Sequence, residues 1–296
     1  MNQRGLRVVR EFDLAPITTL LCDADDNLFP SETPAFAASV EVINRFLARF
    51  GVTAPVTAED LRKRAVGKNF RSTAMELALQ SGVPMEKTLA DRCSGAVVAS
   101  DSELAGGRAL GAEELEEWVR RERQHVTAHL TATLQPDPQV LTALQALASR
   151  YALAAVSSSA SKRLDACFTT TGLDPLIPAA VRFSAEDSLA VPTSKPDPAV
   201  YLHAGRALGI QARHGLAIED SVSGVTSAVA AGYATIGNLM FVPADERPCR
   251  SAELIDAGAV AIIDSWQVLA DTLISTRQVD GARSRNQGQR AVAQSP

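Results

Sequence analysis

The chain has 296 residues, 46% of them hydrophobic and 21% charged, which is typical of a globular protein large enough to bury a core without disulfides. Its formal net charge is −5 and it has no long basic stretch, so nucleic acids and anionic membranes are not expected partners. The four cysteines are far apart, which is typical of free thiols in a reducing compartment. No apolar run approaches the roughly 20 residues that span a bilayer, and residues 1–16 lack the apolar core of a signal peptide. We therefore expect a cytoplasmic protein.

The first predicted element is a buried strand over residues 17–22, a compact apolar and β-branched run that ends abruptly at acidic residues. Residues 1–14 precede it as an N-terminal extension. From residue 33 to residue 135 the pattern is helical almost throughout, with stops at glycines such as Gly51 and Gly82. The sequence therefore predicts a helical region that follows the first strand.

Apolar strands alternate with helices in the remainder of the chain. Strands are predicted at 152–156, 181–184, 215–218, 234–236 and from about 260, and helices at 137–149, 161–171, 198–208 and 222–231, with a last helix to about 273. This alternation indicates a parallel sheet with helices on both faces. The strands are continuous apolar runs, as expected when both faces of a sheet are covered.

The predicted fold class is therefore α/β. A doubly wound parallel-sheet (Rossmann-like) core is formed by residues 15–32 and 136–276. A mainly α-helical cap domain, residues 33–135, is inserted after the first strand. Residues 277–296 have no apolar periodicity and are predicted to be a disordered tail.

Polar side chains follow four of the predicted strands. They are Asp23, Asp25 and Asp26 after the first strand, Ser157, Ser158 and Ser159 after the second, Lys195 in the loop after the third, and Glu219 and Asp220 after the fourth. In a doubly wound sheet, ligands bind outside the carboxyl ends of the strands. Two carboxylate clusters, a hydroxyl cluster and one lysine are therefore expected to meet there.

These residue types suit phosphoryl transfer. Asp23 can attack phosphorus as a nucleophile, and Asp25 can protonate the leaving group and then activate water. The oxygen ligands of Asp23 and Asp220 suit Mg²⁺, which would offset the repulsion between an anionic nucleophile and an anionic phosphate. Ser157 and Lys195 can hold the phosphoryl oxygens. Ser158 is a further candidate for phosphate binding and can equally cap the following helix.

The pattern resembles the haloacid dehalogenase superfamily of hydrolases, in the helical-cap subgroup that includes beta-phosphoglucomutase and sugar-phosphate phosphatases. The matching motifs are Asp23-Ala24-Asp25, Ser157, Ser194-Lys195-Pro196-Asp197-Pro198, and residues 218–225 continuing to Gly232, within a resemblance that covers residues 18–273. The resemblance implies an aspartyl-phosphate intermediate and a small phosphorylated metabolite as substrate. It also implies Mg²⁺ bound by Asp23, the backbone carbonyl of Asp25 and Asp220, with Glu219 close by.

The predicted cap carries a second group of candidate residues. Gly67, Lys68 and Asn69 resemble the substrate-selecting loop of sugar-phosphate members of the family. Lys68 and Arg71 can contact an anionic substrate, because a glycine loop and a helix N-terminus both favour anions. They can equally be solvated surface charges.

One departure from the family pattern lies in the first motif, which usually continues with Gly-Thr and here continues with Asp26-Asn27. Aspartate tolerates left-handed backbone, so the turn is expected to survive. Asn27 can still donate a hydrogen bond, though not from a hydroxyl.

The resemblance leaves alternative reactions. Dehalogenases and phosphonate-cleaving members lack the second acid of the first motif, so Asp25 favours phosphate esters. Mutases typically carry a histidine about a dozen residues past the nucleophile, and residues 31–36 contain none. A phosphatase is therefore the first expectation and a sugar phosphomutase the second. A catalytically weak binding or regulatory member is the non-enzymatic alternative.

Overall fold

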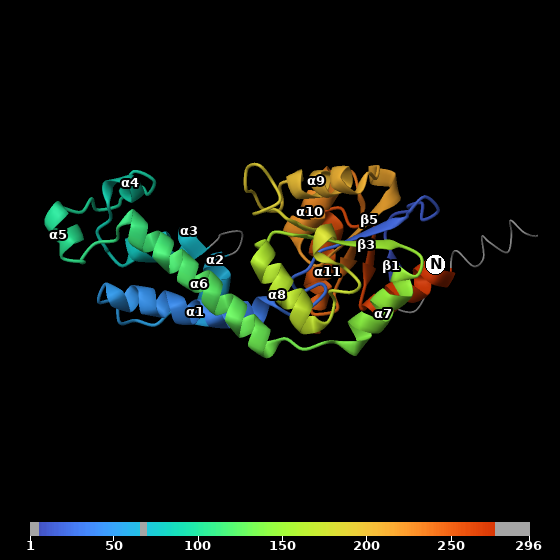
Figure 1. The fold of residues 1–296 in the computed structure, drawn as a ribbon, viewed down its shortest axis with the longest axis horizontal. Coiled ribbons are helices and arrows are strands. Elements are labelled where there is room, and N and C mark those ends of the chain that lie inside the picture. Colours follow the sequence, from blue (N-terminus) through green and yellow to red (C-terminus); the bar gives the residue numbers. More distant parts are fainter. Residues whose placement is uncertain (1–5, 66–69, 276–296) are drawn as a thin grey trace, which may run out of the picture. The chain divides into compact units, whose positions relative to one another are not determined.

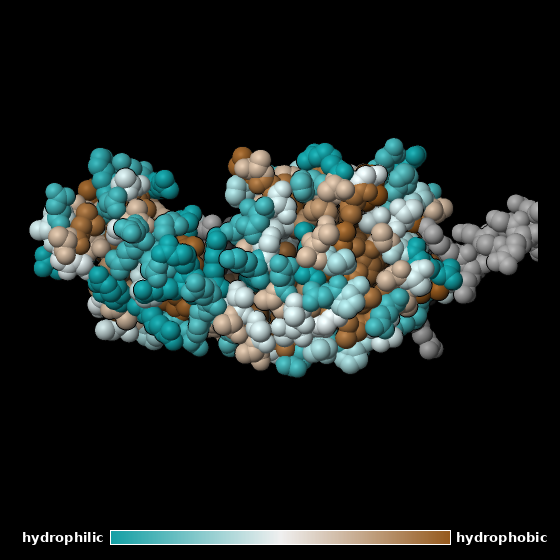
Figure 2. All heavy atoms as spheres, viewed as in Figure 1, coloured by the Kyte–Doolittle hydropathy of each residue, from teal (hydrophilic) through white to brown (hydrophobic). Residues whose placement is uncertain are grey.

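The computed structural model describes residues 6–65 and 70–275 (Figure 1). The chain divides into two compact units, a core unit of Met1–Pro30 with Leu134–Pro296 and a helical unit of Ser31–Thr133. The predicted tail, residues 277–296, lies outside the described residues. Hydrophilic side chains dominate the face of the helical unit that Figure 2 shows. All four cysteines are free.

The core unit is built on a seven-stranded sheet in the order β1-β7-β6-β5-β2-β3-β4. Its strands are β1 (Leu6–Val8), β2 (Thr19–Cys22), β3 (Ala152–Ser157), β4 (Arg182–Ser184), β5 (Gly215–Glu219), β6 (Ala234–Asn238) and β7 (Ala261–Ile263). All neighbours pair in parallel except β1, which runs antiparallel to β7. The predicted α/β fold, with a parallel sheet and an inserted helical region, is confirmed.

Strand β1 lies within residues 1–14, for which the sequence predicted an N-terminal extension and no strand. Leu6 pairs with Ile263 and is buried, whereas Arg7 and Val8 are exposed. A three-residue edge strand with one buried side chain leaves no apolar run in the sequence, which is why the pattern did not indicate it.

The helices of the core unit are α7 (Pro138–Ala148), α8 (Ser161–Thr171), α9 (Ala199–Leu208), α10 (Val222–Ala230), α11 (Arg247–Asp256) and a last helix over residues 266–275. Helices α9 and α10 pack with alternate residues of the central strands, among them Leu21, Ala154 and Ala217. Helix α11 was not predicted, because only Ser251 and Leu254 are buried along it and no apolar stripe results.

The sheet reverses its order at β2, which lies between β3 and β5. The chain moves from β2 outward through β3 and β4, and then returns to the other side to form β5, β6 and β7. Such a reversal opens a crevice at the carboxyl ends of the strands and is where ligands bind in doubly wound sheets. The candidate side chains follow these strand ends.

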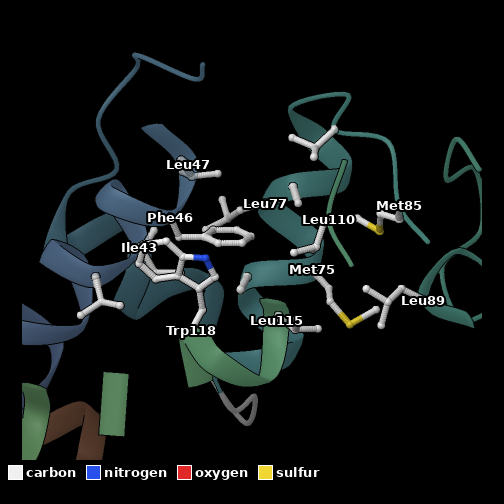
Figure 3. Close-up of a cluster of buried hydrophobic side chains, with 14 of the residues drawn as sticks. Ile43, Phe46, Leu47, Met75, Leu77, Met85, Leu89, Leu110, Leu115 and Trp118 are labelled. Atoms are coloured by element: carbon white, nitrogen blue, oxygen red, sulfur yellow. The ribbon is translucent and has the colours of Figure 1, made fainter. Parts of the chain in front are cut away.

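The helical unit contains α1 (Glu32–Arg49), α2 (Ala58–Ala65), α3 (Phe70–Gln80), α4 (Lys87–Ala90), α5 (Asp101–Ala105) and α6 (Ala112–Thr133). Figure 3 shows its apolar cluster, in which Phe46 and Trp118 meet edge to face with ring centroids 5.8 Å apart. Met75 and Leu115 belong to the same cluster. Helices α4 and α5 are too short to carry a helical period, so the sequence did not indicate them. Across the two described ranges, no helix is long and apolar enough to cross a membrane.

Candidate active site

Asp23 is the first residue after β2, and its backbone is fixed to the neighbouring strand. The Asp23 N–H donates to the carbonyl of Ile218 in β5, with a nitrogen–oxygen distance of 2.9 Å. Its side chain is buried. A carboxylate in this place has little freedom, because the sheet holds both the strand that precedes it and the strand beside it.

Lys195 connects three of the strand ends through its buried ammonium group. Its Nζ donates to Asp23 Oδ1, to the carbonyl of Val156 at 2.8 Å and to Glu219 Oε1 at 2.6 Å. The backbone N–H of Lys195 donates to the hydroxyl of Ser158 at 3.1 Å. Ser158, predicted to bind phosphate, therefore supports the loop that carries the lysine.

Three carboxylates meet at the ends of β2 and β5. Oxygen atoms of Asp23, Glu219 and Asp220 all lie within 4.8 Å of one another. Lys195 compensates one of their three negative charges when all three are ionised, so a divalent cation would neutralise the remaining two. Carboxylate oxygens are also the ligands that Mg²⁺ prefers.

Ionisation of this cluster is controlled by burial. Burial raises the pKa of Asp23, and the ammonium of Lys195 opposes that rise. Burial and the neighbouring charges of Asp23 and Glu219 raise the pKa of Asp220. For Lys195, burial would lower the pKa, but the two carboxylates outweigh it and keep the amine charged. The charged lysine and the crowded acids are the electrostatic setting in which a bound cation is stabilising.

Glu219 is fully buried and only half satisfied. Its Oε1 accepts from Lys195 and from the Tyr201 hydroxyl, whereas Oε2 has no hydrogen-bond partner among the described residues. Burial of the carboxyl raises its pKa. A buried carboxylate oxygen without a partner costs free energy, so it suits a bound cation or a water that serves one. A Cβ at Gly224 would lie 1.8 Å from this oxygen, so the glycine leaves the room that the carboxylate needs.

Asp25 is held by groups from the end of β3, the loop that follows it and the first turn of α8. The hydroxyl of Ser159 donates to Asp25 Oδ2 at 2.7 Å, and that of Ser157 at 3.3 Å. Arg163 in the first turn of α8 donates to Asp25 Oδ1 at 2.9 Å. The structure therefore brings the predicted residues Asp25 and Ser157 together. Sequence reasoning missed Arg163, although a cation in the helix turn after a serine cluster was a visible signal.

The two residues that depart from the family pattern both fit the turn after β2. Asp26 adopts a left-handed backbone with φ of 49°, the conformation expected where the family has glycine. Asn27 is fully buried, and its Nδ2 donates to the carbonyls of Asp23 at 2.8 Å and Ile218 at 3.0 Å. Its Oδ1 accepts from Nδ2 of Asn238 at the end of β6, at 2.8 Å. Asn27 thus joins three strand ends.

The cap candidates belong to the helical unit. Gly67, Lys68 and Asn69 lie outside the described residues. Arg71 lies in the first turn of α3, where its guanidinium pairs with Glu116 Oε2 of α6 at 2.6 Å. Within this unit Arg71 therefore already has an acidic partner.

A family profile matches the part of the chain that carries Asp23, Lys195 and Asp220. The profile of the haloacid dehalogenase-like hydrolase family matches residues 17–232. Among curated proteins, none matches the chain significantly.

Solved structures share the fold over most of the chain. A predicted phosphoglycolate phosphatase from Haemophilus somnus is 16% identical with a TM-score of 0.62, covering 88% of this chain and 99% of its own. A HAD family hydrolase from Deinococcus radiodurans, with bound phosphate and sodium, is 22% identical with a TM-score of 0.56, covering 86% and 94%. CbbY from Rhodobacter sphaeroides, in complex with xylulose-1,5-bisphosphate, is 19% identical with a TM-score of 0.58, covering 85% and 95%. These similarities extend across both units of the chain.

Proposed function

Because the chain belongs to the haloacid dehalogenase-like hydrolase family, we propose that it is a magnesium-dependent phosphatase of a small phosphorylated metabolite. The observation that carries the proposal is the meeting of Asp23 with Lys195, Glu219 and Asp220 at the switch point of the sheet. A carboxylate nucleophile, a fixed cation and a metal-binding cluster are the groups that phosphoryl transfer through an aspartate requires.

In the first step, an oxygen of Asp23 attacks phosphorus and the bond from phosphorus to the ester oxygen breaks. Asp25, carrying a proton, transfers it to the departing alkoxide. Lys195 and Ser157 hold phosphoryl oxygens, with Ser158 supporting the lysine loop. The products of this step are the free alcohol and an aspartyl phosphate on Asp23.

In the second step, water attacks the phosphorus of the aspartyl phosphate. Asp25, now ionised, accepts a proton from this water, and the bond between phosphorus and the Asp23 oxygen breaks. Inorganic phosphate leaves, and both aspartates return to their starting states. One acid group therefore serves both steps in alternating protonation states.

Mg²⁺ would be held by Asp23, the backbone carbonyl of Asp25 and Asp220, with Glu219 beside them. When bound, it would draw charge from the phosphoryl oxygens and reduce the repulsion that an anionic nucleophile meets. The fit rests on the clustered carboxylate oxygens and on the unpartnered Glu219 oxygen.

The proposed substrate class is a sugar phosphate or a similar phosphomonoester. The Haemophilus somnus protein is named a predicted phosphoglycolate phosphatase, and the Rhodobacter sphaeroides protein was solved in complex with a sugar bisphosphate. The cap residues Gly67, Lys68, Asn69 and Arg71 are proposed to select among such esters.

The proposal is tested by replacing Asp23 with asparagine and measuring phosphate release from a panel of sugar phosphates with Mg²⁺. We expect the wild type to release phosphate and the variant to lose release on every substrate. Asp256→Asn, an exposed acid at the end of α11, is the matched control and should behave as wild type. Equal rates of phosphate release for Asp23→Asn and wild type would show that Asp23 is not the nucleophile. Conversion to an isomeric sugar phosphate without phosphate release would identify a mutase.

A further inference from the structure

The carboxylate of Asp25 is bonded at both oxygens by a set of donors close together in sequence. Oδ1 accepts from Arg163, and Oδ2 accepts from Ser159 and, at longer distance, from Ser157. These donors extend from the end of β3 to the first turn of α8. The side chains of Asp25 and Arg163 are 24% and 27% exposed, so the pair lies at the rim of the site, where water can also enter.

One of these donors has a second proposed task. The Ser157 hydroxyl carries a single proton, and its contact with Asp25 is the longest of the three at 3.3 Å. If Ser157 donates to a phosphoryl oxygen when substrate binds, it cannot donate to Asp25 at the same time. Of these three donors, Ser159 and Arg163 then remain on Asp25.

We propose that Arg163 is a positioning residue that fixes the Asp25 carboxyl during catalysis, an inference that rests on the proposed phosphatase function. A charge-assisted bond from a planar guanidinium is stronger and more directional than a neutral one. Arg163 acts through Asp25 and not on the substrate. Its loss therefore slows the steps in which Asp25 moves a proton and leaves phosphate binding by Lys195 intact.

The two chemical steps depend on Asp25 to different degrees. A nitrophenyl phosphate has a leaving group that departs without a proton, so formation of the aspartyl phosphate needs little help from Asp25. Hydrolysis of the aspartyl phosphate needs a base for every substrate. Misplacing Asp25 therefore predicts a burst of nitrophenolate followed by slow steady turnover. An alkyl phosphate should show a lower kcat and no burst.

The experiment compares Arg163→Met with wild type on 4-nitrophenyl phosphate and on a sugar phosphate, by stopped flow and at steady state. We expect kcat to fall roughly ten- to a hundredfold, which is less than the roughly 10²–10⁴-fold that general acid–base catalysis contributes, because Asp25 is displaced and not removed. KM should change little, and a new burst phase should appear. Arg163→Lys should recover part of kcat, because it restores the charge without the planar geometry. Lys162→Met, an exposed cation in the same helix turn, is the control and should match wild type.

Three results would overturn the inference. Unchanged kinetics in Arg163→Met would show that Asp25 needs no such support. A raised KM with unchanged kcat would show that Arg163 binds the substrate directly. An equal loss on both substrates without a burst would indicate a general structural role. If Arg163→Met does not fold, as judged by circular dichroism, Ser159→Ala removes the 2.7 Å bond to the same carboxylate and must give the burst. A wild type inactive on the whole panel would instead refute the proposed function.

Discussion

Replacing Asn27 with alanine should destabilise the core unit, because it removes the amide that joins β2, β5 and β6. Asn27 makes three side-chain hydrogen bonds in a fully buried place, to the carbonyls of Asp23 and Ile218 and from Asn238. The two bonds to carbonyls contribute about 1 kcal/mol net each, and the third partner, Nδ2 of Asn238, is left unsatisfied at a cost of about 1–3 kcal/mol. We therefore expect the free energy of unfolding to fall by about 3–5 kcal/mol.

The variant Asn238→Ala, alone and combined with Asn27→Ala, measures the interaction free energy between the two amide side chains. Once Asn27 is gone, truncating Asn238 removes the unsatisfied donor, so the double variant should be more stable than the sum of the two single losses predicts. We expect a coupling free energy of about 1–2 kcal/mol, which is in the range seen for residues in one hydrogen-bond network.

The assay is denaturant unfolding followed by Trp266 fluorescence in a Trp118→Phe background. Trp118 belongs to the helical unit, whereas the indole of Trp266 donates to the Asn27 carbonyl at 2.7 Å and reports on the core unit alone. Thr171→Val, which removes a buried hydroxyl bonded to the carbonyl of Cys167, serves as the control because it shares no partner with Asn27. Losses for Asn27 and Asn238 that add within about 0.5 kcal/mol would refute the account of a coupled amide pair.

The other predictions concern charge. Lys195→Met should abolish turnover and reduce stability at neutral pH by about 3–5 kcal/mol, because it leaves buried carboxylates without their cation; an active variant of unchanged unfolding midpoint would contradict this. The pKa values of Asp23 and Asp220 are raised in the folded protein, so without metal the folded state binds more protons than the unfolded chain. The stability that these two protonated acids contribute is therefore fully present below their ordinary pKa, and it is lost as the pH rises through the raised pKa values. Mg²⁺ bound at the proposed site would compete with these protons, so its upward shift of the thermal unfolding midpoint should grow from about pH 5 to about pH 8. A shift that shrinks over this range would contradict the cluster as its site.

Much of the fold could be predicted because the central strands are short continuous apolar runs. Strands β2, β3 and β5 are buried along nearly their whole length. Because both of their faces are covered, they consist mostly of consecutive apolar residues, which can be recognised in the sequence. The edge strand β1 and the helix α11 bury few side chains, so tertiary contacts rather than local pattern define them.

The candidate site was predictable for a related reason and only in part. Asp23, Ser157, Lys195 and Asp220 follow strand ends, and parallel strands bring their carboxyl ends to one edge of the sheet. The role of Asn27 depends on Asn238, which is 211 positions away. No local pattern connects two residues that meet only after β6 has joined the sheet.

The role of Arg163 also depends on a contact that forms only in the folded protein. An arginine in a helical turn is most often a solvated charge. The preceding serine cluster marks this turn as part of the site, but it does not identify Asp25 as the partner of Arg163. The pairing follows from α8 starting beside the loop after β2, which is a property of the folded sheet.

The central claim is that Asp23 carries the phosphoryl group between the two steps. It is tested most directly in the Asp25→Asn variant, in which hydrolysis of the intermediate should be slow. The protein is mixed with 4-nitrophenyl phosphate and Mg²⁺, quenched in acid, reduced with borohydride and digested for mass spectrometry. An acyl phosphate on aspartate is reduced to homoserine, so we expect homoserine at position 23 and none in the Asp23→Asn variant. A phosphorylated intermediate at another residue, or turnover with no acyl phosphate at Asp23, would contradict the account.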